Sequence, residues 1–214
     1  MDGHVLFFYG TLMAPQILYR VIHGSVTPQQ WQKDLLRFRP AVLHDYRRHR
    51  VRGADYPGII HEEAHTQASD SVAETTDVPG IKLAAHASVL GTVVSGLTDG
   101  DIHRLDIFEG EMYERKKVSV RILREALGED EESANGAGHG NGAEGLSADT
   151  DRDRHLKDVL EAAGAEFAGE GEEVEAVTYI WIAGREMLED AEWDFEAFKR
   201  DKMAWWVAAD ESEW

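Results

Sequence analysis

The chain has 214 residues, and 43% of them are hydrophobic, which is enough to form the packed core of one domain. Its 22 basic and 41 acidic residues give a formal net charge of -19, which opposes binding to the phosphate backbone of nucleic acids or to an anionic membrane surface. The sequence contains no cysteine, which excludes disulfides, thiolate zinc sites and a cysteine nucleophile.

These features predict a cytoplasmic protein with one domain over residues 1–214 that binds neither nucleic acid nor membranes. The N-terminal sequence MDGHVLFFYG lacks the basic and long apolar regions of a secretory signal. No stretch approaches the roughly 18 consecutive apolar residues that a bilayer-spanning helix needs.

Strand character dominates the first half of the chain. Residues 4–9 (HVLFFY) are mostly β-branched and aromatic, so they predict a buried strand that turns at Gly10. Residues 13–23 carry apolar side chains at helical spacing, which predicts a short helix. Further strands or extended segments are expected over 41–52, 57–60 and 86–97.

A short amphipathic helix is expected over residues 98–108. Thr98 can cap its N-terminus, and Asp101 lies in the first turn. Gly110 ends the helix. The apolar side chains recur at intervals of three and are expected to face the core: Ile102, Leu105 and Phe108.

The next segments predict a strand followed by a long insertion. Apolar and polar residues alternate from Val118 to Ile122, and Tyr113 falls on the opposite parity, so it should face the other side of this strand unless a bulge intervenes. Residues 125–173 combine acidic runs with Gly, Ala, Ser and Asn, which is typical of a mobile, partly disordered insertion. Within it, residues 154–163 could form an exposed helix.

The C-terminal part returns to regular structure. Residues 174–182 (VEAVTYIWI) predict a strand. Residues 192–207 predict one helix packed onto the sheet, with Glu196 and Arg200 as an i,i+4 ion pair. Four apolar side chains are expected near one face of this helix: Phe195, Phe198, Met203 and Trp206.

Residues 61–65 (HEEAH) match the HExxH pattern of zinc proteases, in which two histidines one helical turn apart bind the metal. That chemistry needs an amphipathic helix, yet Pro57 and Gly58 precede the motif and a polar run follows it. We therefore predict no metal, and a hydrolase using His61 and His65 is kept only as an alternative. Neither a phosphate loop nor a dinucleotide fingerprint is present in a strand-to-helix context, so no cofactor is predicted.

Two short segments remain as candidates for chemistry. The turn Tyr9-Gly10-Thr11-Leu12 presents successive backbone N–H groups, which suit a carboxylate or a developing oxyanion. Glu109 comes directly before Gly110, at a helix C-terminus, where the helix dipole disfavours the charged carboxylate and would raise its pKa. Spacing alone favours the simpler interpretation, in which Glu109 is an exposed C-terminal helix residue and Gly110 is only a cap.

Five segments together resemble a known family, and they cover most of the chain outside residues 125–173. They are FFYGTLM (7–13), DYPGI (55–59), VLGTVVSGL (89–97), LDIFEGEMYERKKVSV (105–120) and the tail over 178–203. In this order they resemble the gamma-glutamylcyclotransferase-like family, particularly its avirulence-induced-gene branch. The combination of the YGTL turn with LDxFEGxxYxR is fairly specific, whereas neither half is specific alone.

The resemblance implies an α+β fold, a compact mixed β-barrel flanked by helices with a pocket at its mouth. It also implies an enzyme that releases 5-oxoproline from a small-molecule γ-glutamyl amine or peptide without a cofactor. Glu109 would be the catalytic acid and base. The substrate-binding residues would be Tyr9, Gly10, Thr11 and Leu12, through the backbone, and Tyr113, through its hydroxyl group; Arg115 matches the arginine of the YxR motif.

Other possibilities stay open at this point. A non-catalytic ligand-binding or regulatory protein could have the same fold, because a fold alone does not establish an activity. The amine part of the substrate is not specified, although Tyr56 and Trp181 are candidates for the pocket walls. The acidic insertion over 125–173 could bind a protein partner or could be dispensable.

Overall fold

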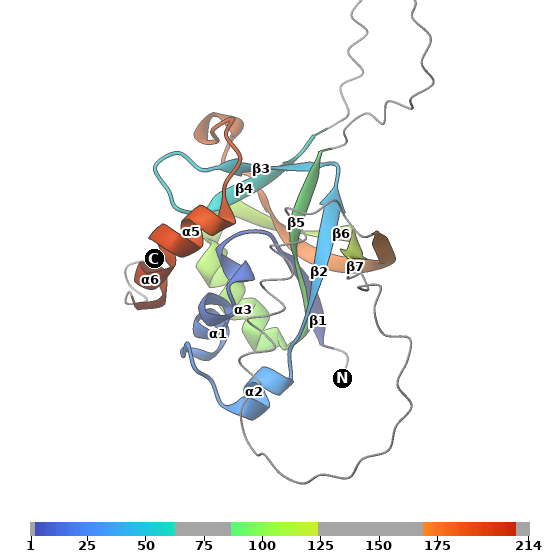
Figure 1. Ribbon diagram of the computed structural model, residues 1–214, viewed down its shortest axis with the longest axis vertical. Coiled ribbons are helices and arrows are strands. Elements are labelled where there is room, and N and C mark those ends of the chain that lie inside the picture. The colour runs from blue at the N-terminus through green and yellow to red at the C-terminus, as the bar shows by residue number, and fades with distance from the viewer. Residues whose placement is uncertain (1–2, 63–86, 124–168, 209–214) are drawn as a thin grey trace, which may run out of the picture.

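The computed structural model describes residues 3–62, 87–123 and 169–208, and in these ranges five strands close into a barrel (Figure 1). Around the barrel the strand order is β1-β5-β2-β6-β7, and β7 returns to β1. The bounds are His4–Phe8 for β1, Arg37–His44 for β2, Ser88–Leu97 for β5, Tyr113–Leu123 for β6 and Glu170–Trp181 for β7. The strands β3 (Tyr46–Arg50) and β4 (Pro57–His61) form a separate two-stranded sheet.

The barrel is mixed, because β1 pairs antiparallel with β5 but parallel with β7, where Leu6 lies opposite Val177. Helix α1 contacts α3 and α6, and α5 contacts α6, so these four helices lie together beside the barrel, whereas α2 lies apart from them (Figure 1). Their bounds are Pro15–His23 for α1, Gln30–Asp34 for α2, Asp99–Glu109 for α3, Phe195–Asp201 for α5 and Met203–Ala208 for α6. Short 3-10 turns cover Thr11–Met13 (η1), Gly110–Met112 (η2) and Arg185–Met187 (η3). The predicted mixed barrel flanked by helices is therefore confirmed.

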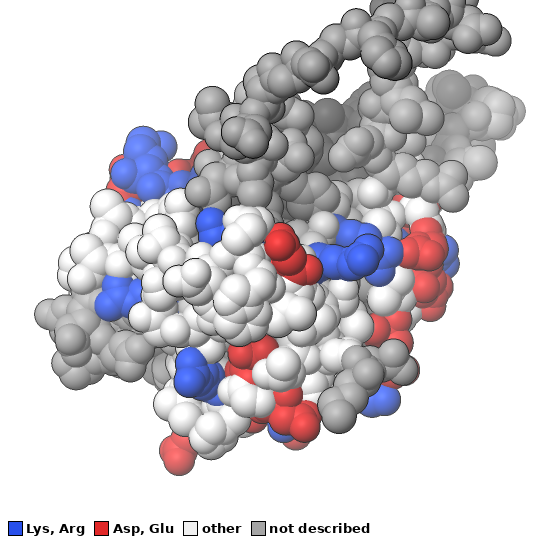
Figure 2. Space-filling view, turned by 90° about the horizontal axis from the view of Figure 1, so that it is seen from below, with Lys and Arg blue, Asp and Glu red and all other residues white. Residues whose placement is uncertain are grey.

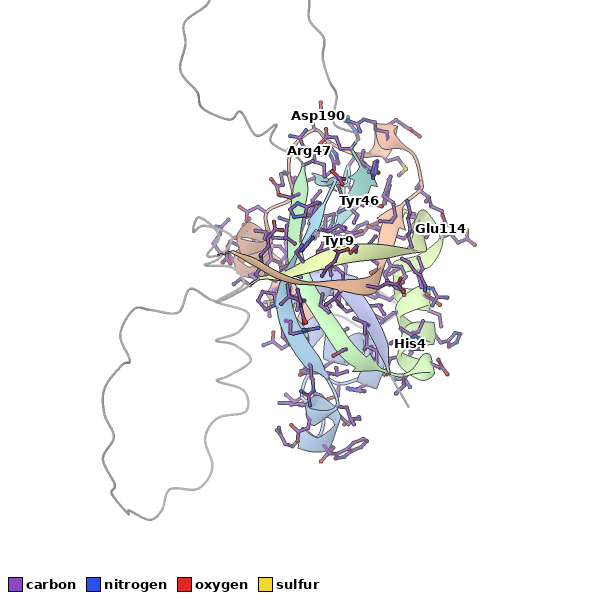
Figure 3. The ribbon with its side chains drawn as sticks, turned by 90° about the vertical axis from the view of Figure 1, so that its right-hand side faces the viewer. His4, Tyr9, Tyr46, Arg47, Glu114 and Asp190 are labelled. Atoms are coloured by element: carbon purple, nitrogen blue, oxygen red, sulfur yellow. The ribbon has the colours of Figure 1, made fainter. Side chains whose placement is uncertain are left out.

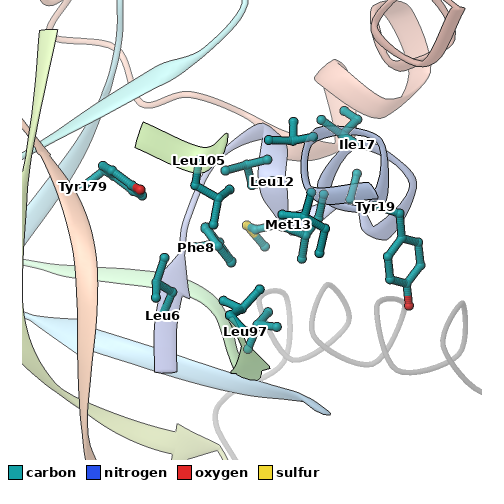
Figure 4. Close-up of a cluster of buried hydrophobic side chains, with 14 of the residues drawn as sticks. Leu6, Phe8, Leu12, Met13, Ile17, Tyr19, Leu97, Leu105 and Tyr179 are labelled. Atoms are coloured by element: carbon teal, nitrogen blue, oxygen red, sulfur yellow. The ribbon is translucent and has the colours of Figure 1, made fainter. Parts of the chain in front are cut away.

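Strand β1 is buried on both faces, which explains its unbroken apolar sequence. Leu6 and Phe8 pack between the barrel and the helices, where they meet Ile17 of α1 and Leu105 of α3 (Figure 4). Phe7 points the other way, into the barrel interior. Tyr9 also lies inside the molecule, whereas the labelled side chains of His4 and Glu114 lie at its outside (Figure 3).

Several predicted elements are present with small changes in their bounds. Thr98 and Asp101 form a reciprocal capping box at the start of α3, as the sequence predicts. The pairing of β6 with β7 is in continuous register from Tyr113 to Arg121, so no bulge intervenes and Tyr113 does face away from Val118. The predicted strand over 86–97 is present as β5.

Two predicted boundaries in the barrel are wrong. The expected strand over 41–52 is split, because Asp45 has a left-handed conformation (φ 64°) and separates β2 from β3. The predicted insertion over 125–173 extends too far, because Glu170 already pairs with Leu123 and begins β7. The helix predicted over 154–163 lies outside the described residues.

The C-terminal prediction is correct in its apolar face and wrong in its continuity. Phe195, Phe198 and Trp206 are buried, but Lys202 leaves the helical conformation and divides the segment into α5 and α6. The predicted ion pair between Glu196 and Arg200 is also wrong. Glu196 pairs with Lys199 at 3.0 Å, and Arg200 pairs with Asp201 at 2.7 Å.

The surface seen in Figure 2 has a broad uncharged area with both basic and acidic side chains around it. Within the described ranges, every helix is too short or too polar to cross a bilayer.

Candidate functional site

A cavity of about 290 Å³ lies where the end of β1 meets α3, η2 and α6. Its lining includes six residues that the sequence singled out: Tyr9, Gly10, Thr11, Leu12, Glu109 and Tyr113. These residues come from two segments that are about a hundred positions apart in the chain. The fold therefore brings the YGTL turn and the FEG segment to one cavity.

The turn after β1 forms part of the cavity lining. The first helical hydrogen bonds run from the Met13 N–H to the Gly10 carbonyl at 3.0 Å and from the Ala14 N–H to the Thr11 carbonyl at 3.1 Å. The preceding N–H groups, on Gly10, Thr11 and Leu12, donate to no acceptor among the described residues. A side chain at Gly10 would place its Cβ 2.8 Å from Cγ of Pro57, so this position requires glycine.

Tyr9 lines the cavity, and both its hydroxyl group and its backbone carbonyl group form hydrogen bonds within the protein. Its buried hydroxyl group donates to the Tyr179 carbonyl at 2.6 Å. Its own carbonyl accepts a hydrogen bond from Nη1 of Arg48 at 3.0 Å. Burial and the nearby carboxyl of Glu109 raise the pKa of Tyr9 well above its usual range, so its hydroxyl stays protonated.

Arg48 is a residue that sequence inspection missed. Its guanidinium group also donates to Glu192 at 3.1 Å and stacks over the ring of Trp193, 5.6 Å from the ring centroid. It therefore joins β3, the end of β1 and the segment before α5. Nothing in the local sequence YRRHR distinguishes Arg48 from its neighbouring arginines, because its partners are remote in sequence.

Glu109 is the last residue of α3 and lines the cavity instead of extending freely into solvent. Desolvation by burial raises the pKa of its carboxyl group from 4.5 to about 8. Gly110 follows with φ 67°, a conformation that favours glycine, and so turns the chain from α3 into η2. The direction of the pKa shift agrees with the sequence-based expectation.

Tyr113 lies across the cavity at the start of β6. Its hydroxyl group donates to the Pro57 carbonyl at 2.8 Å, and its ring meets Trp181 edge to face at 5.2 Å between centroids. Burial, followed by the nearby groups of Tyr9 and Glu109, raises the pKa of Tyr113. Of the two side chains suggested as walls, Tyr56 lines the cavity, and Trp181 instead packs behind Tyr113.

Arg115 does not line the cavity. Its Nε forms an ion pair with Asp106 at 3.1 Å, and Asp106 accepts a hydrogen bond from the hydroxyl group of Tyr179 at 2.9 Å. Because Tyr179 lines the cavity, Arg115 is connected to the site through Asp106 and Tyr179.

The described part of the HExxH segment does not have the geometry of a zinc protease. His61 ends strand β4, and its ring packs edge to face on Tyr46 at 5.2 Å. Glu62 pairs with Arg47 at 3.3 Å, and residues 63–65 lie outside the described ranges. Among the described side chains, no group of three or more His, Asp or Glu residues is placed to hold a metal ion.

The barrel and a cavity shared by the turn after β1 and the carboxyl group of Glu109 can be compared with known proteins. Residues 6–72 match the family described as "Gamma-glutamyl cyclotransferase, AIG2-like". This match and the relatives below make the chain similar to the AIG2-like branch of that family.

Two relatives come from Arabidopsis thaliana. "Protein AIG2 C" is 27% identical over 123 residues, which cover 58% of this chain and 54% of the relative. "AIG2-like protein D" is 30% identical over 119 residues, which cover 56% of this chain and 57% of the relative. The chain thus spans about half the length of the curated relatives it matches.

Two solved structures are also similar. A solution structure of an Arabidopsis thaliana protein is 20% identical, with a TM-score of 0.46, covering 100% of this chain and 89% of that one. The crystal structure of a yeast gamma-glutamyl cyclotransferase specific to glutathione is 14% identical, with a TM-score of 0.38, covering 90% of this chain and 74% of that one.

Proposed function

We propose that the protein is a gamma-glutamylcyclotransferase-type enzyme that releases 5-oxoproline from a γ-glutamyl amine or peptide. The observation that carries the proposal is that Glu109, with a pKa raised to about 8, shares one cavity with the backbone donors of the turn over residues 9–12. The similarity of residues 6–72 to the family described as "Gamma-glutamyl cyclotransferase, AIG2-like" supports the same chemistry.

The reaction needs no external nucleophile. The α-amino nitrogen of the substrate attacks its own γ-carbonyl carbon, and the bond from that carbon to the leaving nitrogen then breaks. The α-ammonium group loses two protons in forming the lactam, and the leaving amine gains two in becoming an ammonium ion. Enforcing this folded conformer in a pocket can be worth roughly 7 to 11 kcal/mol.

In this scheme Glu109 carries one of those protons. As a carboxylate it accepts a proton from the attacking amine, and as a carboxylic acid it returns that proton to the leaving nitrogen. The other proton exchanges with solvent. A pKa of about 8 is close to neutral pH, so both protonation states are populated and neither transfer is strongly uphill.

The turn over residues 9–12 would bind the oxygen of the γ-carbonyl group as its negative charge develops. The N–H groups of Gly10, Thr11 and Leu12 are the available donors, and one such donor is typically worth about 3 kcal/mol. Tyr113 would complete the pocket with its hydroxyl oxygen, which can still accept a hydrogen bond while donating to Pro57.

The test is 5-oxoproline release by the purified protein from a panel of γ-glutamyl compounds. We expect Glu109→Gln to lower kcat by about 10² to 10⁴ without loss of the fold. The matched control is Glu111→Gln, because Glu111 is exposed in η2 and does not line the cavity. A Glu109→Gln variant with wild-type turnover would refute the assignment of the acid and base.

A non-catalytic ligand-binding protein is the alternative function. The hydroxyl groups of Tyr9 and Tyr113 both donate to backbone carbonyl groups, so they hold the shape of the pocket and are not free to transfer protons. This favours ligand binding, because only the carboxyl group of Glu109 then remains for proton transfer. A folded protein that releases no 5-oxoproline from any member of the panel, yet is stabilised against heat by some of them, would favour this alternative.

A further inference from the structure

Three aromatic rings from separate elements form one wall of the cavity beside Glu109. The ring of Trp206, on α6, meets Phe108 of α3 edge to face at 6.1 Å and Tyr56 edge to face at 6.5 Å between centroids. All three residues line the cavity. Because Trp206 is buried and Tyr56 and Phe108 pack against the same core cluster, this wall is built into the fold.

Ile107 extends the apolar surface to the mouth of the cavity. It lines the cavity although it is 68% exposed, so its side chain lies where the cavity meets solvent. An isoleucine this exposed gains no stability from burial in the free protein. We call Tyr56, Ile107, Phe108 and Trp206 together the apolar subsite.

The proposed chemistry fixes which half of a substrate would reach the apolar subsite. A proton donor must approach the leaving nitrogen to within about 2.6 to 3.2 Å, so the substituent on that nitrogen must lie beside Glu109. Phe108 and Ile107 immediately precede Glu109 on α3, and the charge of Glu109 acts on the hydroxyl group of Tyr56. The γ-glutamyl half would meanwhile face the turn over residues 9–12.

We propose that the apolar subsite binds the substituent of the leaving amine and selects an aromatic or branched aliphatic group there. The place of this subsite in the reaction rests on the proposed cyclotransferase function. A carboxylate in the same position would lose its hydration against three rings and would approach the carboxyl group of Glu109. The favoured leaving amines are therefore apolar ones, in preference to amino acids that carry a free carboxylate.

The experiment compares γ-glutamylbenzylamide with γ-glutamylglycine. Both compounds share the γ-glutamyl half and release a primary amine on a CH₂ group, and they differ in carrying a phenyl ring or a carboxylate. Turnover by the wild-type protein is measured as 5-oxoproline release. Affinity is measured separately as Kd on the Glu109→Gln variant, so that binding is determined without turnover.

We expect the benzylamide to have at least a tenfold higher kcat/KM and at least a tenfold lower Kd. Ile107→Lys should place a cation at the mouth of the cavity. In the Glu109→Gln background it should reduce the ratio of the Kd of γ-glutamylglycine to the Kd of the benzylamide at least tenfold. Ile182→Lys is the matched control, because Ile182 is 54% exposed but does not line the cavity, and it should leave the preference unchanged.

The outcomes separate the subsite from the proposed function. Release of 5-oxoproline from both compounds with equal kcat/KM would uphold the function and overturn the subsite. Tighter binding of the benzylamide with no release from either compound would support the subsite and overturn the function. Binding of neither compound, or tighter binding of γ-glutamylglycine, would overturn the subsite.

Discussion

At the scale of single residues, the protonation of Glu109 makes the stability of the folded protein depend on pH. Its folded-state pKa is raised from 4.5 to about 8, so between these pH values the folded protein retains a proton that the unfolded chain has lost. The stability contributed by the neutral carboxyl group is complete below about pH 4.5 and is lost as the pH rises through about 8. The raised pKa that would suit Glu109 to proton transfer therefore lowers the free energy of unfolding in the alkaline range.

Glu109→Gln should remove this pH dependence, because the amide is neutral at every pH. We expect the variant to match the wild type near pH 4.5 and to be more stable at pH 8, by on the order of 2 kcal/mol once partial solvent screening is allowed for. Urea unfolding at the two pH values measures the difference. If wild-type and variant stabilities change in parallel with pH, the pKa of Glu109 is not raised in the folded state.

The residues of the cavity differ in how far the sequence could predict them. The positions of Gly10 and Glu109 follow from local signals, a strand ending in a turn and a helix ending at glycine. Arg48 could not be predicted in this way, because its partners Tyr9 and Glu192 lie 39 and 144 positions away. Only the folded chain brings them into contact.

At the scale of elements, Arg48 of β3 contacts backbone carbonyl groups where the pairing of β1 with β5 ends. Its Nη1 lies 3.0 Å from the Tyr9 carbonyl and 3.5 Å from the Leu90 carbonyl, just beyond the last paired residues of β1. We expect Arg48→Gln to destabilise the fold by about 1 to 3 kcal/mol, because the carbonyl groups of Tyr9 and Leu90 would lose their charged hydrogen-bond donor. Urea unfolding of the purified variant measures the loss.

The control is Arg50→Gln, on the same strand, because Arg50 is 53% exposed and its contact to Glu189 is long, at 3.8 Å. A surface pair of this kind is worth about 0 to 1 kcal/mol. Arg48→Lys should be destabilised as well, because an ammonium group cannot reproduce the forked contacts of a guanidinium group. Equal stabilities of the Arg48→Gln and Arg50→Gln variants would show that Arg48 does not hold these elements together.

Gly58 marks the close approach of β4 to β7. A Cβ at this position would lie 2.9 Å from Cβ of Trp181, whose ring supports Tyr113. Gly58→Ala should therefore lower the free energy of unfolding by about 1 to 3 kcal/mol through overpacking.

Gly100→Ala is the control, since its Cβ would meet only Oγ1 of Thr98 at 3.7 Å and alanine favours a helix by about 0.5 to 1 kcal/mol. Thermal unfolding should rank Gly100→Ala above the wild type and Gly58→Ala below it, and the reverse order would contradict this packing.

Element boundaries were less predictable than the elements themselves. The alternation of apolar and polar residues does not show that Asp45 takes a left-handed conformation, so β2 and β3 are predicted as one strand. In the C-terminal segment, apolar spacing identifies the buried face correctly but does not show the break at Lys202. The break allows Phe198 and Trp206 to pack at 6.1 Å across the two short helices, a contact that depends on tertiary structure.

At the scale of the whole molecule, the barrel is closed by strands that are distant in sequence. The first strand pairs with the last, where Leu6 lies opposite Val177. The composition of residues 125–173 predicts an insertion, but it does not show where pairing resumes. The structure places Glu170 opposite Leu123, so the described ends of β6 and β7 already meet as they would in a hairpin.

This meeting of ends predicts that much of the connection is dispensable. Deleting residues 129–151 roughly halves the number of residues between Leu123 and Glu170, and the entropic cost of closing a loop falls by only about 0.6 kcal/mol when its length is halved. We expect the deletion variant to unfold in one cooperative transition at a urea midpoint equal to or slightly above that of the wild type, with unchanged kcat/KM for 5-oxoproline release. A lower midpoint would show that the deleted residues contribute contacts to the fold. Intact stability with lost turnover would instead show that they act at the cavity.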